Sequence, residues 1–197
     1  MSKQTANKKN NISKSARKKK PCPSNFTVNV FDWASAFVAA LSLVVLVMTF
    51  CVRVVNIDGG SMMPTLQDKN KTLVTGLNYE PKVGDIVVIS HGVSLNKMIV
   101  KRVIAVGGQT VDIDFKTGEV TVDGVVLDEP YINGKTLRQD DVAFPLEVAE
   151  GTVFVLGDNR PISHDSRASE VGLIETQNIV GKVRCRLFPF DKFGTIE

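Results

Sequence analysis

A serine follows two glycines in the segment Gly59-Gly60-Ser61-Met62-Met63-Pro64. Glycines let a backbone turn tightly and approach a substrate closely. A serine exposed on such a turn can act as a nucleophile, and its own N–H can stabilise an oxyanion. The Gly-x-Ser-x-Gly pattern of a nucleophile elbow is not completed, because residue 63 is methionine. Ser61 is therefore a candidate nucleophile, although an ordinary Gly-Ser turn has the same composition.

Two basic residues, Lys101 and Arg102, lie within the branched apolar run 98–106, which is predicted to be a strand. On a strand, Lys101 shares a face with apolar neighbours, and burial lowers the pKa of a lysine toward the range of a general base. Arg102 also lies between apolar residues on the opposite face of the strand, so the strand periodicity does not show which of the two residues is the base. A guanidinium is never neutral in a protein and cannot accept a proton. Lys101 is therefore the candidate base, and a surface lysine on an edge strand is the alternative.

A polar loop over residues 157–167 follows the apolar strand predicted at 152–156. Loops at strand ends commonly carry function on a rigid scaffold. The loop combines both signs of charge with two serines, and a solvated, turn-rich loop is the alternative interpretation. Its polar residues are Asp158, Asn159, Arg160, Ser163, His164, Asp165, Ser166 and Arg167.

Histidine chemistry has few candidates, because the chain contains only His91 and His164. His164 and Asp165 are adjacent in sequence, and strand neighbours point to opposite faces, so they are poor partners for each other. The sequence has no HExxH zinc motif, P-loop or GxGxxG motif. A Ser61-His164-Asp165 hydrolase remains as an alternative, and replacement of His164 by alanine distinguishes it from a Ser-Lys enzyme.

An uncharged, mostly apolar run extends from Trp33 to Val52. This length is about the 20 residues that a helix needs to cross a bilayer core. The Lys/Arg cluster before the run predicts that the N-terminus stays cytoplasmic and that the rest is exported. A cleaved secretory signal is the competing prediction, but its apolar core is usually shorter, and no small-x-small site follows closely in the bulky segment 52–55. We therefore predict a retained transmembrane anchor over residues 32–53.

The basic character of the chain belongs to its N-terminal tail. Residues 1–31 are predicted to be a disordered cytoplasmic tail, because their composition cannot bury enough apolar surface to fold. Without the tail's basic residues, 16 basic residues face 21 acidic ones, so the remainder is acidic and does not predict nucleic-acid binding. The basic residues of the tail are Lys3, Lys8, Lys9, Lys14, Arg17, Lys18, Lys19 and Lys20.

The segment 54–197 is predicted to be an extracytoplasmic domain, mainly β and built from an antiparallel sheet. Short runs rich in β-branched residues alternate with turn residues, and the pair Asp123-Gly124 is the strongest hairpin pattern. A short helix is predicted directly after Ser61. The predicted strands are 53–57, 86–90, 98–106, 110–113, 119–122, 125–127, 152–156 and 182–188.

Four segments behind the predicted anchor resemble the type I signal peptidase (leader peptidase) family, and they occur in the family's order. They are Ser61–Leu66, Gly84–Val88, Lys101–Ile104 and Gly157–Arg167. The resemblance spans residues 30–187 and implies an antiparallel β domain whose apolar surface near the site touches the membrane. It implies neither a metal nor an organic cofactor.

The resemblance implies a bacterial Ser-Lys enzyme in which Ser61 is the nucleophile and Lys101 the general base. The implied reaction is endoproteolytic removal of signal peptides from exported preproteins, after small residues at the first and third positions before the cut. The implied partners are therefore preproteins and the lipid bilayer. The resemblance also implies that Ser163 would orient the Lys101 amine. Three charged residues would hold the loop in shape: Asp158, Asp165 and Arg167. Met62 and Pro64 would contact the substrate.

This chain departs from the family pattern at the oxyanion hole. Some members place a serine hydroxyl two residues before the nucleophile, where this chain has Gly59. The hole would then depend on the Ser61 N–H. Two further alternatives stay open: a catalytically inactive, membrane-tethered peptide-binding protein of the same fold, and a Ser-Lys self-cleaving repressor of the SOS type, which would need a DNA-binding motif and a soluble chain.

Overall fold

The computed structural model describes residues 25–76, 79–90 and 98–196. The chain divides into two units, Met1–Leu43 and Val44–Glu197. Residues 1–24 of the predicted basic tail lie outside the described ranges, as does His91.

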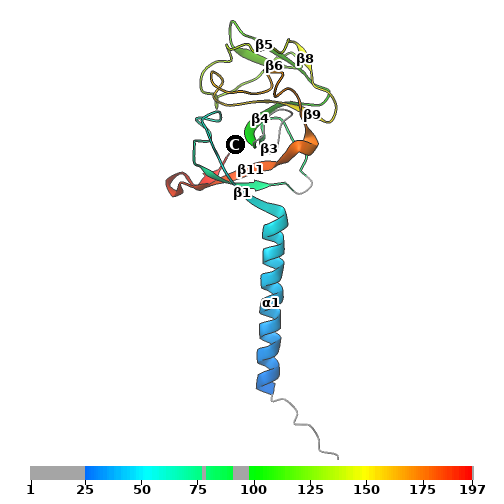
Figure 1. Cartoon of the computed structure of the whole chain (residues 1–197), viewed down its shortest axis with the longest axis vertical. Helices are drawn as coiled ribbons and strands as arrows, with labels where there is room; N and C mark the ends of the chain where they lie inside the picture. Colours follow the sequence, from blue (N-terminus) through cyan, green and yellow to red (C-terminus); the bar gives the residue numbers. More distant parts are fainter. Residues whose placement is uncertain (1–24, 77–78, 91–97, 197) are drawn as a thin grey trace, which may run out of the picture. The chain divides into compact units, whose positions relative to one another are not determined.

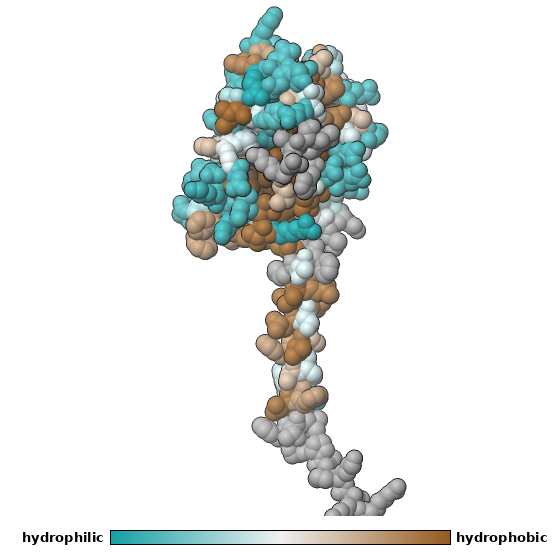
Figure 2. Space-filling view, in the orientation of Figure 1, coloured by the Kyte–Doolittle hydropathy of each residue, from teal (hydrophilic) through white to brown (hydrophobic). Residues whose placement is uncertain are grey.

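The helix α1 spans Asn25–Cys51. It begins before the predicted anchor boundary at residue 32, and the chain changes to a strand at Val52. Its visible side chains are mostly apolar (Figure 2). Within the described part of the chain, α1 is the one helix that is long and apolar enough to cross a membrane, over Asn29–Val47.

The described residues form two sheets, and the larger one has eight strands whose neighbouring pairs are all antiparallel. Its order is β1-β2-β11-β3-β4-β9-β10, with β12 paired to β11. The C-terminal strand β11 thus inserts between two strands from the first half of the chain. The bounds are β1 Val52–Asn56, β2 Lys71–Thr75, β3 Ile86–Ile89, β4 Ile99–Val106, β9 Thr152–Leu156, β10 Ile174–Glu175, β11 Ile179–Phe188 and β12 Gly194–Thr195.

The smaller sheet has the order β7-β6-β5-β8 and is also antiparallel. Its strands gather at one end of the β unit, with β1 and β11 at the other (Figure 1). Asp123 and Gly124 both have positive φ, 52° and 78°, as a two-residue hairpin turn of type I′ requires. The predicted hairpin is therefore confirmed. The bounds are β5 Thr110–Asp114, β6 Glu119–Val122, β7 Val125–Val126 and β8 Leu146–Glu147.

The central strand β3 is buried on both faces, because apolar clusters cover each side of the larger sheet. Val87 and Ile89 belong to one cluster, whereas Ile86 and Val88 belong to another. The strand reads as a continuous apolar run for that reason. The predicted fold class, an antiparallel β domain behind one N-terminal apolar helix, is confirmed.

The segment after Ser61 differs from the prediction, because it forms turns rather than an assigned helix. One helical hydrogen bond joins the Leu66 N–H to the Met62 carbonyl at 2.8 Å. Pro64 has no N–H and cannot continue such a ladder. Among the described residues, two 3₁₀ helices lie elsewhere, as η1 at Thr176–Asn178 and η2 at Phe190–Lys192.

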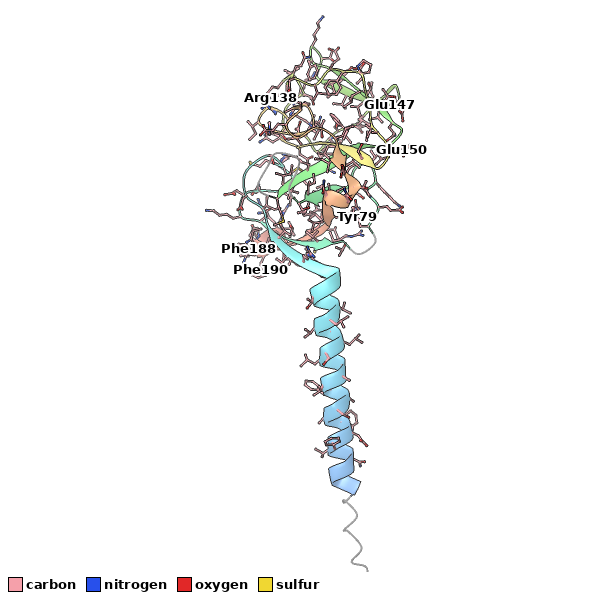
Figure 3. All side chains as sticks on the ribbon, turned by 45° about the vertical axis from the view of Figure 1, so that its right-hand side comes forward. Tyr79, Arg138, Glu147, Glu150, Phe188 and Phe190 are labelled. Atoms are coloured by element: carbon pink, nitrogen blue, oxygen red, sulfur yellow. The ribbon has the colours of Figure 1, made fainter. Side chains whose placement is uncertain are left out.

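Exposed aromatic side chains gather around η2. The rings of Phe188 and Phe190 pack edge to face with centroids 5.6 Å apart, and Figure 3 shows the two residues together. Phe190 and Phe193 are 80% and 64% exposed. Lys192 Nζ donates to Gln67 Oε1 at 3.1 Å, so this aromatic segment contacts the turn that carries Ser61.

Candidate active site

Ser61 lies in the connection between the edge strand β1 and its neighbour β2. The turn is closed by a hydrogen bond from the Met63 N–H to the Gly60 carbonyl at 3.2 Å. Met62 and Leu66 are buried in the core beneath the turn, with exposed fractions of 1% and 0%. Burial of these two side chains anchors the turn, so that Ser61 is held on a rigid base while staying partly exposed.

Lys101 lies in the middle of β4, paired with Val87 of β3. Its side chain is buried, and its Nζ donates to the Ser163 hydroxyl at 3.1 Å. Burial lowers the pKa of Lys101 from 10.5 to about 8, and the positive charge of Arg167 acts in the same direction. The carboxylates of Asp165 and Asp158 oppose the shift without cancelling it. About a tenth of the amine is therefore neutral at pH 7, far more than for an ordinary lysine.

Arg102 points away from this amine and binds a carboxylate. Its Nε and Nη2 donate to the two carboxylate oxygens of Asp158, each at 2.9 Å, and its guanidinium lies 3.9 Å from the centre of the Tyr131 ring. Thr65 also donates its hydroxyl to Asp158. Asp158 therefore links β4 to the turn that carries Ser61, and Lys101 and Arg102 have separate roles.

The loop 157–167 is held by buried ion pairs. Asp165 accepts from Arg167 Nε at 2.8 Å and from the Gly157 N–H at 3.1 Å. Burial opposes ionisation of Asp165, but the Arg167 guanidinium outweighs it and keeps the pKa of this carboxyl below its usual range. Arg167 Nη2 also donates to the Ser163 carbonyl at 3.2 Å. These bonds place the Ser163 hydroxyl against Lys101.

A cavity of about 570 Å³ brings the candidate residues together. Ser61 and Lys101 both line it, and apolar side chains form most of its wall. Met62 is a lining residue, whereas Pro64 is exposed and is not one. The lining residues are Val55, Asn56, Ile57, Asp58, Gly59, Gly60, Ser61, Met62, Met98, Ile99, Val100, Lys101, Ile162 and His164.

Two backbone edges meet at this cavity. Val55 and Asn56 end the edge strand β1, and Ile99 and Val100 begin β4. Within the described ranges, β9 pairs with β4 only from Arg102 onward, so the first residues of β4 pair on the β3 side alone. Unpaired strand edges can bind an extended peptide through its main chain.

His164 also lines the cavity, but its partner is not Asp165. Its Nε2 lies 3.1 Å from a Glu170 oxygen, and the imidazole side chain is 43% exposed. Asp165 is fully buried and bound by Arg167. The geometry therefore does not assemble a Ser-His-Asp relay from His164 and Asp165.

Sequence reasoning missed two contacts that support the loop. Arg160 is buried and bound by Glu129 through both terminal nitrogens. Asn159 donates to the Ser61 turn through its backbone and its side chain. Both residues lie within the polar loop singled out in the sequence, but their partners lie far away along the chain, and no local pattern predicts such pairings.

A family model described as "Signal peptidase, peptidase S26" matches residues 30–188. Signal peptidase I T of Bacillus subtilis (strain 168) is 35% identical, over 95% of this chain and 97% of that protein. Signal peptidase IB of Staphylococcus aureus (strain COL) is 35% identical, over 83% and 92%. The crystal structure of a signal peptidase I from Enterococcus faecalis aligns with 28% identity and a TM-score of 0.42, over 53% of this chain and 97% of that one. The family model and the two sequence relatives show that this chain belongs to the signal peptidase family, peptidase S26.

Proposed function

We propose that this chain is a membrane-anchored endopeptidase that removes signal peptides from exported preproteins, with Ser61 as nucleophile and Lys101 as general base. The observation that carries the proposal is the buried Lys101 amine, 3.1 Å from the Ser163 hydroxyl and lining the same cavity as Ser61. The relatives named signal peptidase I support the reaction class.

The mechanism follows from the groups at this site. Neutral Lys101 takes the Ser61 proton, Oγ attacks the scissile carbonyl carbon, and the carbonyl oxygen becomes an oxyanion that accepts the Ser61 N–H. Protonated Lys101 then gives its proton to the leaving amine, and an acyl-enzyme remains. Water attacks this ester with Lys101 as base and restores Ser61. The Ser163 hydroxyl and the ion pairs of Asp158, Asp165 and Arg167 orient Lys101 throughout.

The substrate is proposed to bind as an extended chain between the two strand edges, with Met62 in contact with it and Pro64 at the exposed side of the turn. The apolar lining suits small, uncharged side chains before the cut.

Contact of the domain with the membrane is supported by two exposed aromatic side chains. Phe190 and Phe193 lie on a segment that contacts the turn that carries Ser61. Aromatic side chains favour membrane interfaces.

The proposed topology is a cytoplasmic basic tail over residues 1–31, an anchor over residues 32–53 and an extracytoplasmic domain over residues 54–197. The apolar α1 and the basic residues that precede it support this orientation. The alternative of an inactive peptide-binding protein has no support among the relatives, which are named as peptidases.

Cleavage of a preprotein with an Ala-x-Ala site, in detergent or liposomes, tests the proposal. We expect the native chain to cut after the second alanine and His164→Ala still to cut, because the His164 side chain pairs with the surface residue Glu170 and not with Asp165. N-terminal sequencing of the product locates the cut. A native chain that never cuts would restore the inactive alternative, and a dead but folded His164→Ala would restore the histidine hydrolase.

The pH dependence of kcat/KM tests the role of Lys101. Because burial lowers the pKa of Lys101 to about 8, the amine is mostly protonated below this pH and neutral above it. We expect kcat/KM to rise about tenfold per pH unit below pH 8 and to level off above it. A peptide substrate without ionisable groups keeps its own titration out of the profile. A flat profile between about pH 6 and 9 contradicts a lysine base.

A further inference from the structure

Asn159 contacts two successive carbonyls of the turn that carries Ser61. Its backbone N–H donates to the Ser61 carbonyl at 2.9 Å, and its side-chain Nδ2 donates to the Gly60 carbonyl at 3.0 Å. Asn159 is buried, with an exposed fraction of 6%. One residue therefore holds the peptide groups on both sides of the Ser61 Cα.

The bond to the Gly60 carbonyl, which also accepts the Met63 N–H, helps to set where the Ser61 N–H points. In a trans peptide the carbonyl and the following N–H point in opposite directions. Because Asn159 holds the Gly60 carbonyl, the N–H of the same Gly60–Ser61 peptide is turned to the other side. Among the hydrogen bonds of the described residues, none uses the Ser61 N–H as donor, so this group is available to an oxyanion.

Asn159 also contacts the residue that orients the base. Its carbonyl accepts the Ser163 N–H at 2.9 Å, and the Ser163 hydroxyl in turn accepts from Lys101. The Asn159 amide is itself held by Asn133, whose Nδ2 donates to Asn159 Oδ1 at 3.2 Å. Asn159 thus ties the turn of the nucleophile to the partner of the base, with its own side chain oriented by a further residue.

We propose that Asn159 is a positioning residue whose side chain, held on a backbone that links Ser61 to Ser163, aims the Ser61 N–H at the oxyanion. This role rests on the proposed function. It acts through Ser61, because the Asn159 amide binds the protein's own backbone and is not a lining residue of the cavity.

The test compares the native chain with Asn159→Ala in three measurements. The first is peptide cleavage, for which we expect kcat to fall about 10- to 100-fold with little change in KM. The second is inhibition by an Ala-x-Ala peptide aldehyde. Ser61 Oγ bonds to the aldehyde carbon, its proton passes to Lys101, and the aldehyde oxygen becomes an oxyanion facing the Ser61 N–H. The third is binding of the product peptide that ends in Ala-x-Ala.

Aldehyde affinity is expected to fall by the same factor as kcat, whereas product-peptide affinity stays at the native value. The aldehyde mimics the transition state, so its affinity depends on the contact with the oxyanion. The product peptide forms no oxyanion, so its affinity depends only on binding in the cavity. The matched control is Asn70→Ala, because Asn70 is also buried and its side chain also bonds a backbone group, the Gln67 N–H at 3.1 Å, away from the cavity. Asn70→Ala is expected to lose stability but keep kcat and aldehyde affinity.

If Asn159→Ala does not fold, Asn133→Ala replaces it, because this change frees the Asn159 amide without removing it and is expected to produce a smaller loss of the same kind. Native kcat and aldehyde affinity in a folded Asn159→Ala overturn the positioning role. Equal loss of aldehyde and product-peptide affinity also overturns it, since a collapsed cavity explains both. A native chain that cleaves nothing contradicts the proposed function itself and is thereby distinguished from these outcomes.

Discussion

The Lys101→Met variant is expected to lose at least about 10³-fold in kcat while unfolding at the native temperature or above it. General-base catalysis contributes about 10² to 10⁴-fold, and an unactivated serine is a weak nucleophile at neutral pH. Methionine keeps an unbranched side chain of similar length, so the 3%-exposed site stays filled. It also removes a charge whose burial is unfavourable, which the lowered pKa of Lys101 indicates.

This combination of lost activity and retained stability separates catalysis from folding. Activity is measured by single-turnover cleavage of a preprotein, and stability by thermal unfolding followed by circular dichroism. Ser61→Ala is expected to be equally inactive, because no hydroxyl remains to form the acyl-enzyme, and the double variant is expected to be no worse than either single one. Lys116→Met, in the exposed turn between β5 and β6, is the matched control and keeps native activity. Substantial cleavage by a folded Lys101→Met would remove Lys101 from the mechanism.

The second large effect is expected for Gly157→Ala, with a loss of about 100-fold in kcat. A Cβ at residue 157 would lie 2.2 Å from the Ser163 hydroxyl oxygen and 2.6 Å from the Ser61 carbonyl oxygen. Neither distance is tolerated, so the methyl group must push the nucleophile turn and the Lys101 partner apart. A displacement of about 1 Å in a catalytic group costs on the order of 10²-fold in rate.

Gly194→Ala is the matched control for this substitution. A Cβ at residue 194 would meet nothing within 4 Å, and its φ is not in the left-handed region. We expect Gly194→Ala to keep native kcat and Gly157→Ala to lose activity at a temperature where both variants are folded, as judged by circular dichroism. Native activity of Gly157→Ala would mean that Ser61 and Ser163 need not approach each other closely during the reaction.

Much of the fold could be predicted because its local patterns have local causes. The uncharged run after Trp33 predicts α1 by composition, and Asp123-Gly124 predicts its hairpin because these residues tolerate positive φ. Strands β6 and β9 match their predicted bounds. Strand β2 was missed, since Thr72 and Val74 are its buried residues and a buried threonine weakens the apolar alternation.

The candidate site, like the fold, has features that the sequence predicts and features that only the structure shows. Residue chemistry alone favours Lys101 over Arg102 as a base, because only an amine can become neutral. The partner of Lys101, Ser163, was implied by the family resemblance and by no pattern in the residues, and the partner of Arg102, Asp158, came only from the structure. These pairs join positions more than fifty residues apart, and no periodicity along the chain specifies them.

The sequence by itself determined the apolar helix, most of the strands, the hairpin and the chemical types of the candidate residues. Only the tertiary structure decided that β11 inserts between β2 and β3, that burial lowers the pKa of Lys101 to about 8, and that Asn159 holds the Ser61 turn. The physical reason is that helices, turns and alternation depend on neighbours along the chain. Strand order, desolvation and hydrogen bonding between distant loops depend instead on which surfaces pack together once the whole domain folds.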